Sequence, residues 1–212
     1  MRIDAGDTRL EGDLDFPADA QGVVLFAHGS GSSRHSPRNR YVAQVLQQAG
    51  FVTLLIDLLT ETEEAINRNT GHLRFDIALL SNRLLGATDW LQEHPPTRHL
   101  RTGYFGASTG SAAALCAAAE RPNLIKAVVS RGGRPDLAGS ALARMRAPTL
   151  LIVGAEDGPV IEMNREAMTR LSTEKKLEII PGATHLFEEP GALEEVARLA
   201  CDWFERYLMA KG

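Results

Sequence analysis

A serine, an aspartate and a histidine occupy positions from which they could carry out nucleophilic catalysis together. The serine lies in Gly106-Ala107-Ser108-Thr109-Gly110, a G-x-S-x-G pattern between an apolar run and an alanine-rich segment. The two glycines permit a turn so tight that the serine hydroxyl is exposed at the end of a strand. Since a serine hydroxyl is a weak nucleophile at neutral pH, it needs a base, and the base needs an orienting carboxylate.

Candidates for both partners follow the serine in the order acid, then histidine. Asp157 comes after the apolar run 149–153, and His185 comes after the run 177–180. Either residue alone would be taken for an ordinary loop residue, but their order and placement favour a triad of Ser108, Asp157 and His185. Glu156, in the same loop as Asp157, is a competing choice for the acid.

Backbone N–H groups near Ser108 could stabilise an oxyanion. The N–H of Thr109, the residue after the nucleophile, is one expected donor. The second donor should come from the loop after an earlier strand, where we favour Ser30 and keep Gly31 as the alternative. His28 in that loop is expected to hydrogen-bond loop backbone and hold the turn rather than to act in catalysis. The other histidines are expected at the surface: His35, His72, His94 and His99.

The glycine-containing loop 29–34 could also be interpreted as a phosphate-binding loop, because it follows a strand and precedes a helix. In a G-x-G-x-x-G fingerprint the third glycine would fall at Arg34, where a large side chain prevents close packing of helix and strand. The sequence also contains no G-K-[ST] pattern. This interpretation is therefore weak.

The elements that must position these residues follow an alternating pattern. Segment 10–16 alternates apolar and charged residues and predicts a half-exposed edge strand. Short runs rich in β-branched and aromatic residues predict strands at 23–27, 52–56, 103–105, 125–129, 149–153 and 177–180. Several of them are continuously apolar, as expected for parallel strands covered on both faces.

Helical periodicity fills the segments between these runs. Helices are predicted from Ser36 to Gly50, over 75–90, over 109–120 and from Pro190 through Tyr207. Strands alternating with helices in one domain, residues 1–212, indicate an α/β fold with a doubly wound, mostly parallel sheet. Ligand sites in such sheets lie at the carboxyl ends of the strands, where Ser108, Asp157 and His185 are expected.

Composition excludes several classes of protein. The net charge of −4 gives no electrostatic reason to expect nucleic acid or an anionic membrane as a partner. The amino terminus lacks the apolar core of a signal peptide, and no apolar run approaches the length of a membrane helix. Cys116 and Cys201 are expected to be buried free thiols. A cytoplasmic location is the default expectation.

These motifs together resemble the α/β-hydrolase superfamily and, within it, the dienelactone-hydrolase-like branch. The resemblance spans nearly the whole chain and rests on His28-Gly29, on 106–110, on Gly154-x-x-Asp157 and on 182–187. It implies that Ser108 is the nucleophile, Asp157 the orienting acid and His185 the general base. Dienelactone hydrolase itself has a cysteine where Ser108 stands here, so its substrate does not carry over.

The predicted activity is cleavage of small soluble carboxylic esters through an acyl-enzyme, without a metal or organic cofactor. Segment 131–148 is too short for a lid domain and leaves room for about one helix near 137–145, which predicts an open, shallow site. Arg34 or Arg131 could bind an acidic group of the substrate, although structural ion pairs are the simpler role for either. Thioester hydrolysis, acyl transfer and a non-catalytic binding module remain alternatives. The chain is expected to be a monomer or a homodimer.

Overall fold

A mostly parallel sheet of eight strands forms the centre of the molecule. The structure is a computed structural model and describes residues 1–209. The strands are β1 (Arg2–Ala5), β2 (Thr8–Asp15), β3 (Gly22–Ala27), β4 (Phe51–Ile56), β5 (Thr102–Ala107), β6 (Ile125–Arg131), β7 (Thr149–Gly154) and β8 (Lys175–Ile180). Their order is β1-β2-β4-β3-β5-β6-β7-β8, and β2 runs antiparallel to both of its neighbours, β1 and β4. The predicted doubly wound sheet is confirmed.

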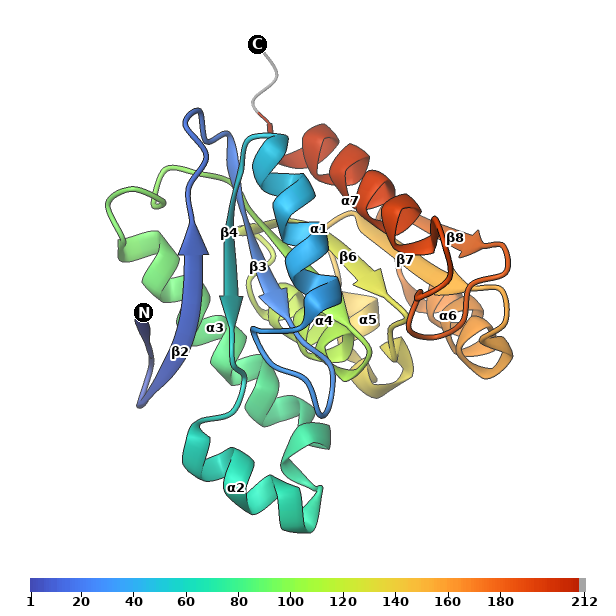
Figure 1. The fold of residues 1–212 in the computed structure, drawn as a ribbon, viewed down its shortest axis with the longest axis horizontal. Helices are drawn as coiled ribbons and strands as arrows, with labels where there is room; N and C mark the ends of the chain where they lie inside the picture. The colour runs from blue at the N-terminus through green and yellow to red at the C-terminus, as the bar shows by residue number, and fades with distance from the viewer. Residues whose placement is uncertain (210–212) are drawn as a thin grey trace.

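Helices cover both faces of this sheet (Figure 1). The α-helices are α1 (Pro37–Gln48), α2 (Glu61–Thr70), α3 (Ile77–Glu93), α4 (Thr109–Glu120), α5 (Ala141–Arg144), α6 (Gly158–Arg170) and α7 (Ala192–Leu208). The 3₁₀ helices are η1 (Leu73–Phe75) and η2 (Pro135–Ala138). Helices α1 and α7 pack together on one face, whereas α3 and α4 pack on the other.

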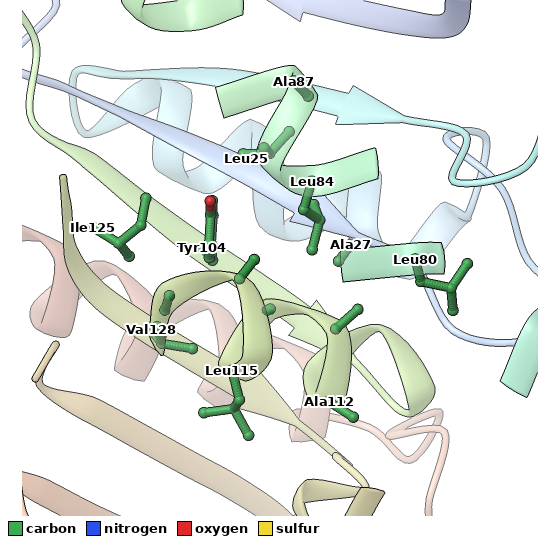
Figure 2. Close-up of a cluster of buried hydrophobic side chains, with 14 of the residues drawn as sticks. Leu25, Ala27, Leu80, Leu84, Ala87, Tyr104, Ala112, Leu115, Ile125 and Val128 are labelled. Carbon is green, nitrogen blue, oxygen red and sulfur yellow. The ribbon is translucent and has the colours of Figure 1, made fainter. Parts of the chain in front are cut away.

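The sheet separates two apolar cores, one under each helical layer. The core beneath α3 and α4 contains Leu84 and Leu115 of these helices and Leu25 and Tyr104 of the central strands (Figure 2). All four side chains are fully buried. Burying one leucine contributes about 1.5–3 kcal/mol, so this layer fixes α4, the helix that begins directly after Ser108. The Tyr104 hydroxyl is paired with Thr88 Oγ1 at 2.6 Å.

Three elements and one strand assignment differ from the sequence-based prediction. Segment 10–16 does form a strand, but β1 pairs with it from outside, so it is not the edge of the sheet. We did not predict β1, α2 or α6. Thr60 and Glu63 form a capping box at the start of α2, and this sequence signal could have revealed the helix. Pro159, in the first turn of α6, is a similar signal.

The connection 131–148 contains only η2 and α5, each of four residues. The fold therefore has no lid domain there, as predicted. Cys116 and Cys201 are free thiols, and both are half-buried. Within residues 1–209, no helix combines the length and apolar character that crossing a membrane requires.

Candidate active site

Ser108 lies on a strained turn between β5 and α4. Its φ of 50° places it in the left-handed region, which residues other than glycine rarely adopt. The turn is held by two backbone bonds, from Ser108 N–H to the Arg131 carbonyl and from Arg134 N–H to the Ser108 carbonyl, both 3.2 Å long. A nucleophile elbow requires this strand–turn–helix geometry.

The two glycines of the motif are required by close backbone contacts. A Cβ at Gly106 would lie 2.5 Å from Ser111 Cα. A Cβ at Gly110 would lie 2.3 Å from the His28 carbonyl oxygen and 2.4 Å from that of Ala27. Because these neighbours are backbone atoms, they cannot move aside as a flexible side chain could. The sequence Gly-x-Ser-x-Gly thus lets α4 start directly against the end of β3.

The loop after β3 lies over this turn, as the oxyanion prediction requires. A Cβ at Gly29 would lie 3.0 Å from Ser108 Cβ. Ser30 and Thr109 line the same small cavity, of about 10 Å³. Thr109 is the first residue of α4, so its N–H has no acceptor inside the helix. Within the described residues, the N–H groups of Ser30 and of the alternative donor Gly31 have no hydrogen-bond acceptor either.

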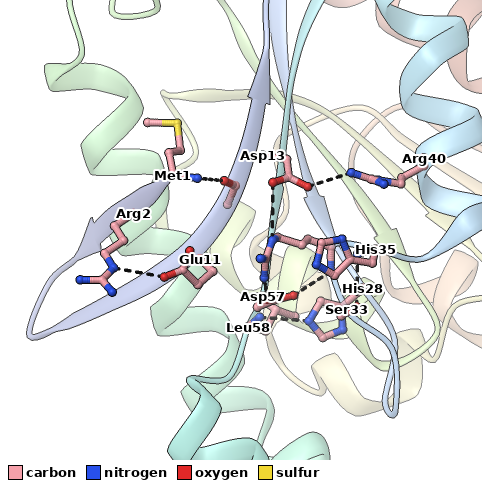
Figure 3. Close-up of polar contacts among 12 residues, drawn as sticks. Met1, Arg2, Glu11, Asp13, His28, Ser33, His35, Arg40, Asp57 and Leu58 are labelled. Carbon is pink, nitrogen blue, oxygen red and sulfur yellow. Dashed lines mark hydrogen bonds and ion pairs between the residues drawn. The ribbon is translucent and has the colours of Figure 1, made fainter.

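His28 ties the loops after β3 and β4 together. The Leu58 N–H donates to His28 Nε2 at 3.0 Å, so Nδ1 must carry the proton, which it donates to the Gly29 carbonyl at 2.9 Å. Figure 3 shows the imidazole of His28 facing Leu58. Burial lowers the pKa of His28, which keeps the ring neutral and therefore able to accept. The predicted role of His28, holding the turn, is confirmed.

Asp157 and His185 meet at the carboxyl ends of β7 and β8. His185 Nδ1 lies 2.6 Å from Asp157 Oδ2, and the Asp157 carboxylate is largely buried while the imidazole is partly exposed. Gly154 allows this approach, because a Cβ there would lie 2.2 Å from the Ala183 carbonyl oxygen. Glu156 is exposed, and its N–H bonds the Ala183 carbonyl. The geometry therefore pairs the histidine with Asp157 rather than with Glu156.

A short path of contacts connects this pair to the serine. The N–H of Ser108 bonds the Arg131 carbonyl, and the next residue along the chain, Gly132, packs against the histidine. A Cβ at Gly132 would lie 3.4 Å from His185 Cε1. The structure contains the Asp157–His185 hydrogen bond but none between Ser108 Oγ and His185. Catalytic hydrogen bonds of this kind are often long without a substrate and tighten when it binds.

A groove of about 1030 Å³ opens beside the oxyanion loop. The loop 31–38 forms one wall, and Leu59, Thr60 and α2 form another. In Figure 1, α2 projects beyond the carboxyl ends of the strands. The residues that line this groove do not include Ser108, Asp157 or His185. Helix α2 gives the groove a wall that the sequence analysis did not anticipate.

Arg34 is held by two carboxylates. Its guanidinium pairs with Asp57, and its Nε lies 3.5 Å from Asp13 Oδ1. The Arg34 N–H also donates to Asp57 at 2.7 Å. Arg40 reaches the other oxygen of Asp13 at 3.1 Å (Figure 3). Carboxylates of the protein therefore neutralise the charge of Arg34, which favours a structural role for Arg34 over binding of a substrate acid.

Arg131 has the opposite surroundings. Its side chain is only 7% exposed, and within residues 1–209 no carboxylate pairs with it. Its contacts are a 3.4 Å hydrogen bond to Asn39 Oδ1 and the ring of Phe187, 5.8 Å from the guanidinium carbon. Burial, and then the charge of Arg38, lower the pKa of Arg131 to about 10, so it stays charged at neutral pH. Sequence reasoning placed Arg131 and Arg38 at the same rim of the site but missed Asn39 and Phe187 as neighbours of Arg131.

Fold and site together define an α/β hydrolase core: a doubly wound sheet with the elbow, the Asp157–His185 pair and the donor loop at one edge. Within the described residues there is no cluster of three or more potential metal ligands from His, Cys, Asp or Glu. A family model described as the dienelactone hydrolase family matches residues 10–210. The chain belongs to that family.

Individual relatives agree on the fold. A crystal structure of dienelactone hydrolase from Anabaena variabilis is 65% identical, with a TM-score of 0.96, over 98% of this chain and 96% of that one. A Bradyrhizobium protein, provisionally named a 2-oxo-3-(5-oxofuran-2-ylidene)propanoate lactonase, is 30% identical over 71% of this chain and 69% of that protein.

A Mycobacterium tuberculosis protein, provisionally named a phosphoribosyl transferase, is 56% identical over all 212 residues. This chain spans 47% of that protein's length.

Proposed function

We propose that this chain hydrolyses small carboxylic esters, lactones included, through an acyl-enzyme on Ser108. The observation that carries the proposal is the 2.6 Å contact between His185 Nδ1 and Asp157 Oδ2, next to a serine held at a φ of 50°. The carboxylate fixes the tautomer in which Nδ1 carries a proton and Nε2 can act as the base. Membership of a hydrolase family supports the same chemistry.

In the proposed reaction, Ser108 Oγ attacks the ester carbonyl while His185 Nε2 takes its proton. Asp157 stabilises the imidazolium that forms. The Thr109 and Ser30 N–H groups donate to the oxyanion, and His185 then delivers its proton to the leaving alcohol. A water molecule, activated by the same histidine, adds to the acyl carbonyl and releases the acid. All proton transfers in this scheme use side chains of the chain itself.

Lactones are included because they are cyclic esters and would pass through the same acyl-enzyme; the Bradyrhizobium relative is named a lactonase. The mycobacterial relative's name points instead to phosphoribosyl transfer. We propose that such an activity belongs to the part of that protein outside the match, because this chain's site is built for attack on a carbonyl. Thioester hydrolysis and acyl transfer would use the same acyl-enzyme with a different leaving group or acceptor.

The proposal is tested with a fluorophosphonate probe and a panel of short p-nitrophenyl esters and small lactones. We expect the probe to label wild-type protein at Ser108, and we expect Ser108→Ala to lose both labelling and turnover. Ser172→Ala is the matched control, since Ser172 is exposed and lies outside the elbow. Folded wild-type protein that neither reacts with the probe nor cleaves any ester or lactone would contradict the proposal.

A further inference from the structure

Asn164 is a polar side chain in the core that the proposed reaction does not use. It lies in α6 and is fully buried. Its amide nitrogen donates to the Gly133 carbonyl at 3.0 Å and to the Val160 carbonyl at 2.8 Å. Because both neighbours are acceptors, the side chain must turn its NH₂ toward them. The bond to Val160 stays inside the helix, whereas the bond to Gly133 joins α6 to the loop 131–134.

The loop 131–134 is bonded to the nucleophile on both sides. The Ser108 N–H donates to the Arg131 carbonyl, and the Ser108 carbonyl accepts from the Arg134 N–H. Both bonds are 3.2 Å long, which is the weak end of the range for backbone hydrogen bonds. A serine at a φ of 50° keeps that conformation only while its surroundings enforce it. The position of the loop 131–134 is therefore part of what holds the serine in place.

The same loop packs against the proposed base. A Cβ at Gly132 would lie 3.4 Å from His185 Cε1 and 3.2 Å from the His185 carbonyl oxygen. On the other side of the loop, a Cβ at Gly133 would collide with the hydroxyls of Ser130 and Ser111, which are hydrogen-bonded to each other. Two consecutive glycines have no side chains with which to hold themselves. The position of their peptide groups therefore depends on a partner outside the loop.

Helix α6, which supplies that partner, begins at the acid of the triad. Asp157 directly precedes the helix, and its carbonyl accepts from the Ile161 N–H at 3.0 Å. Asn164 lies about two turns beyond Asp157 on the same helix. It therefore connects the segment that carries the acid with the loop that contacts the other two residues of the triad.

We propose that Asn164 is a positioning residue for the reaction. Its bond to Gly133 holds the loop 131–134 where Ser108, His185 and Asp157 can act together. The inference rests on the proposed function for the reaction itself. A displacement of about 1 Å in a reacting group can cost about 100-fold in rate. Since Asn164 does not line the groove, losing its bond to Gly133 should lower kcat and leave KM nearly unchanged.

Two substitutions separate the two bonds of the asparagine. Asn164→Leu is similar in size and donates to neither carbonyl. Asn164→Thr has one O–H donor, which in a helix bonds the carbonyl four residues back, here that of Val160, so none is left for Gly133. Both variants should lower kcat for p-nitrophenyl acetate at least about tenfold, with KM within about twofold of the wild type. A wild-type kcat in Asn164→Thr would overturn the proposal, and this variant also serves if Asn164→Leu does not fold.

Thr97→Val is the matched control. Thr97 is also fully buried, and its hydroxyl donates to the Leu91 carbonyl at 2.7 Å. It precedes β5, so it lies toward the amino ends of the strands, away from the triad. The control loses a buried bond of the same kind, and it should therefore unfold at a lower temperature while keeping the kcat of the wild type. Asn164 variants that lose stability but no more kcat than Thr97→Val would contradict a positioning role.

Hydrogen exchange separates this inference from the proposed reaction. In both Asn164 variants, the amides of segments 106–111 and 131–134 should exchange at least about tenfold faster relative to the other segments, measured on peptides by mass spectrometry. Thr97→Val should leave these two segments unchanged. That result stands even if no ester is cleaved, in which case the reaction fails and the dependence of the loop on Asn164 remains. Unchanged exchange of both segments would overturn the inference, whatever the esterase result.

Discussion

Two regions on either side of the groove are held by different forces. The elbow region, residues 106–111 with the loop 27–31, is fixed by backbone packing: a Cβ at Gly110 would lie 2.3 Å from a carbonyl oxygen. The flank region, residues 57–76 with α2, is fixed by charges. Arg83 of α3 reaches Glu63 of α2 at 2.7 Å, and Asp57 holds Arg34.

The difference separates the two tasks of an enzyme site. Steric packing holds atoms to within tenths of an ångström, which attack on a carbonyl requires. Ion pairs near the surface are weaker and adjust more easily, which suits the wall of a groove that receives substrates. The elbow region should therefore tolerate almost no change, whereas the flank region should tolerate several.

The largest effect is expected from Gly110→Ala. The added methyl would collide with the Ala27 and His28 carbonyls, costing about 3 kcal/mol of unfolding free energy. A displaced elbow should also lower kcat/KM at least about 100-fold. Gly158→Ala is the control: no atom lies within 4 Å of its added Cβ, so denaturant unfolding and ester assays should match the wild type. Equal behaviour of the two variants would contradict steric control of the elbow.

A smaller effect is expected from His28→Phe, which breaks the link between the two regions. The Leu58 N–H would lose its acceptor, at a cost of about 1–3 kcal/mol. Since the same loop carries Ser30, we expect kcat to fall about tenfold while KM changes little. Steady-state kinetics with a neutral ester and chemical denaturation measure both effects. His35→Phe, in the same loop but exposed, is the control; a His28 variant no different from it would refute the link.

Two arginine substitutions should differ in their effect on stability. Arg34→Met leaves the largely buried Asp57 without its cation, whereas Asp13 keeps Arg40, so we expect a loss of about 1–2 kcal/mol in unfolding free energy. Arg131→Met removes a charge with no partner and should cost nothing. Urea titrations of the two variants under the same conditions make the comparison. Destabilisation of both to the same extent would show that the two arginines do not differ as the contacts imply.

The smallest effect concerns acid stability of the flank region. Burial alone would raise the pKa of Glu63, but hydrogen bonds from Thr60 and Arg83 outweigh it and lower the pKa. A lowered pKa means that the contact contributes fully above the ordinary value of 4.5 and is lost as pH falls through the folded value. We expect Glu63→Gln to remove about 0.5 kcal/mol near neutral pH and nothing in strong acid. The measurement is a set of unfolding curves of the wild type and Glu63→Gln between strong acid and neutral pH. A loss of unfolding free energy that is the same at every pH would contradict this prediction.

The parts of the fold that sequence predicted are those fixed by local pattern. The runs ending before Ser108 and Asp157 are buried because both faces of the sheet are covered there, whereas the run before His185 belongs to the partly exposed edge strand β8. The glycines are required by contacts close to the elbow. Helix α2 was missed because its residues are mostly polar and it has little apolar face. Its capping box, Thr60 with Glu63, was nevertheless visible in the sequence. The four-residue β1 was too short to show a period.

The electrostatic differences between arginines could not be predicted in the same way. Arg34 and Arg131 both follow a strand and both looked like rim residues. Whether either is neutralised depends on which carboxylates the fold brings near, and Asp57 is 23 residues from Arg34 along the chain. That no carboxylate within residues 1–209 pairs with Arg131 depends on every segment that the fold packs around it, and no local sequence pattern contains that information.

The central claim is that Ser108 becomes acylated. The most direct test lets the protein react with p-nitrophenyl acetate, stops the reaction with acid, and measures the masses of the intact protein and of its peptides. The account predicts one acetyl group on the peptide containing Ser108, formed in a burst as p-nitrophenol is released. Ser108→Ala should show neither the burst nor the adduct. Ester cleavage by the wild type that persists in Ser108→Ala, or an acetyl group found on another residue, would contradict the account.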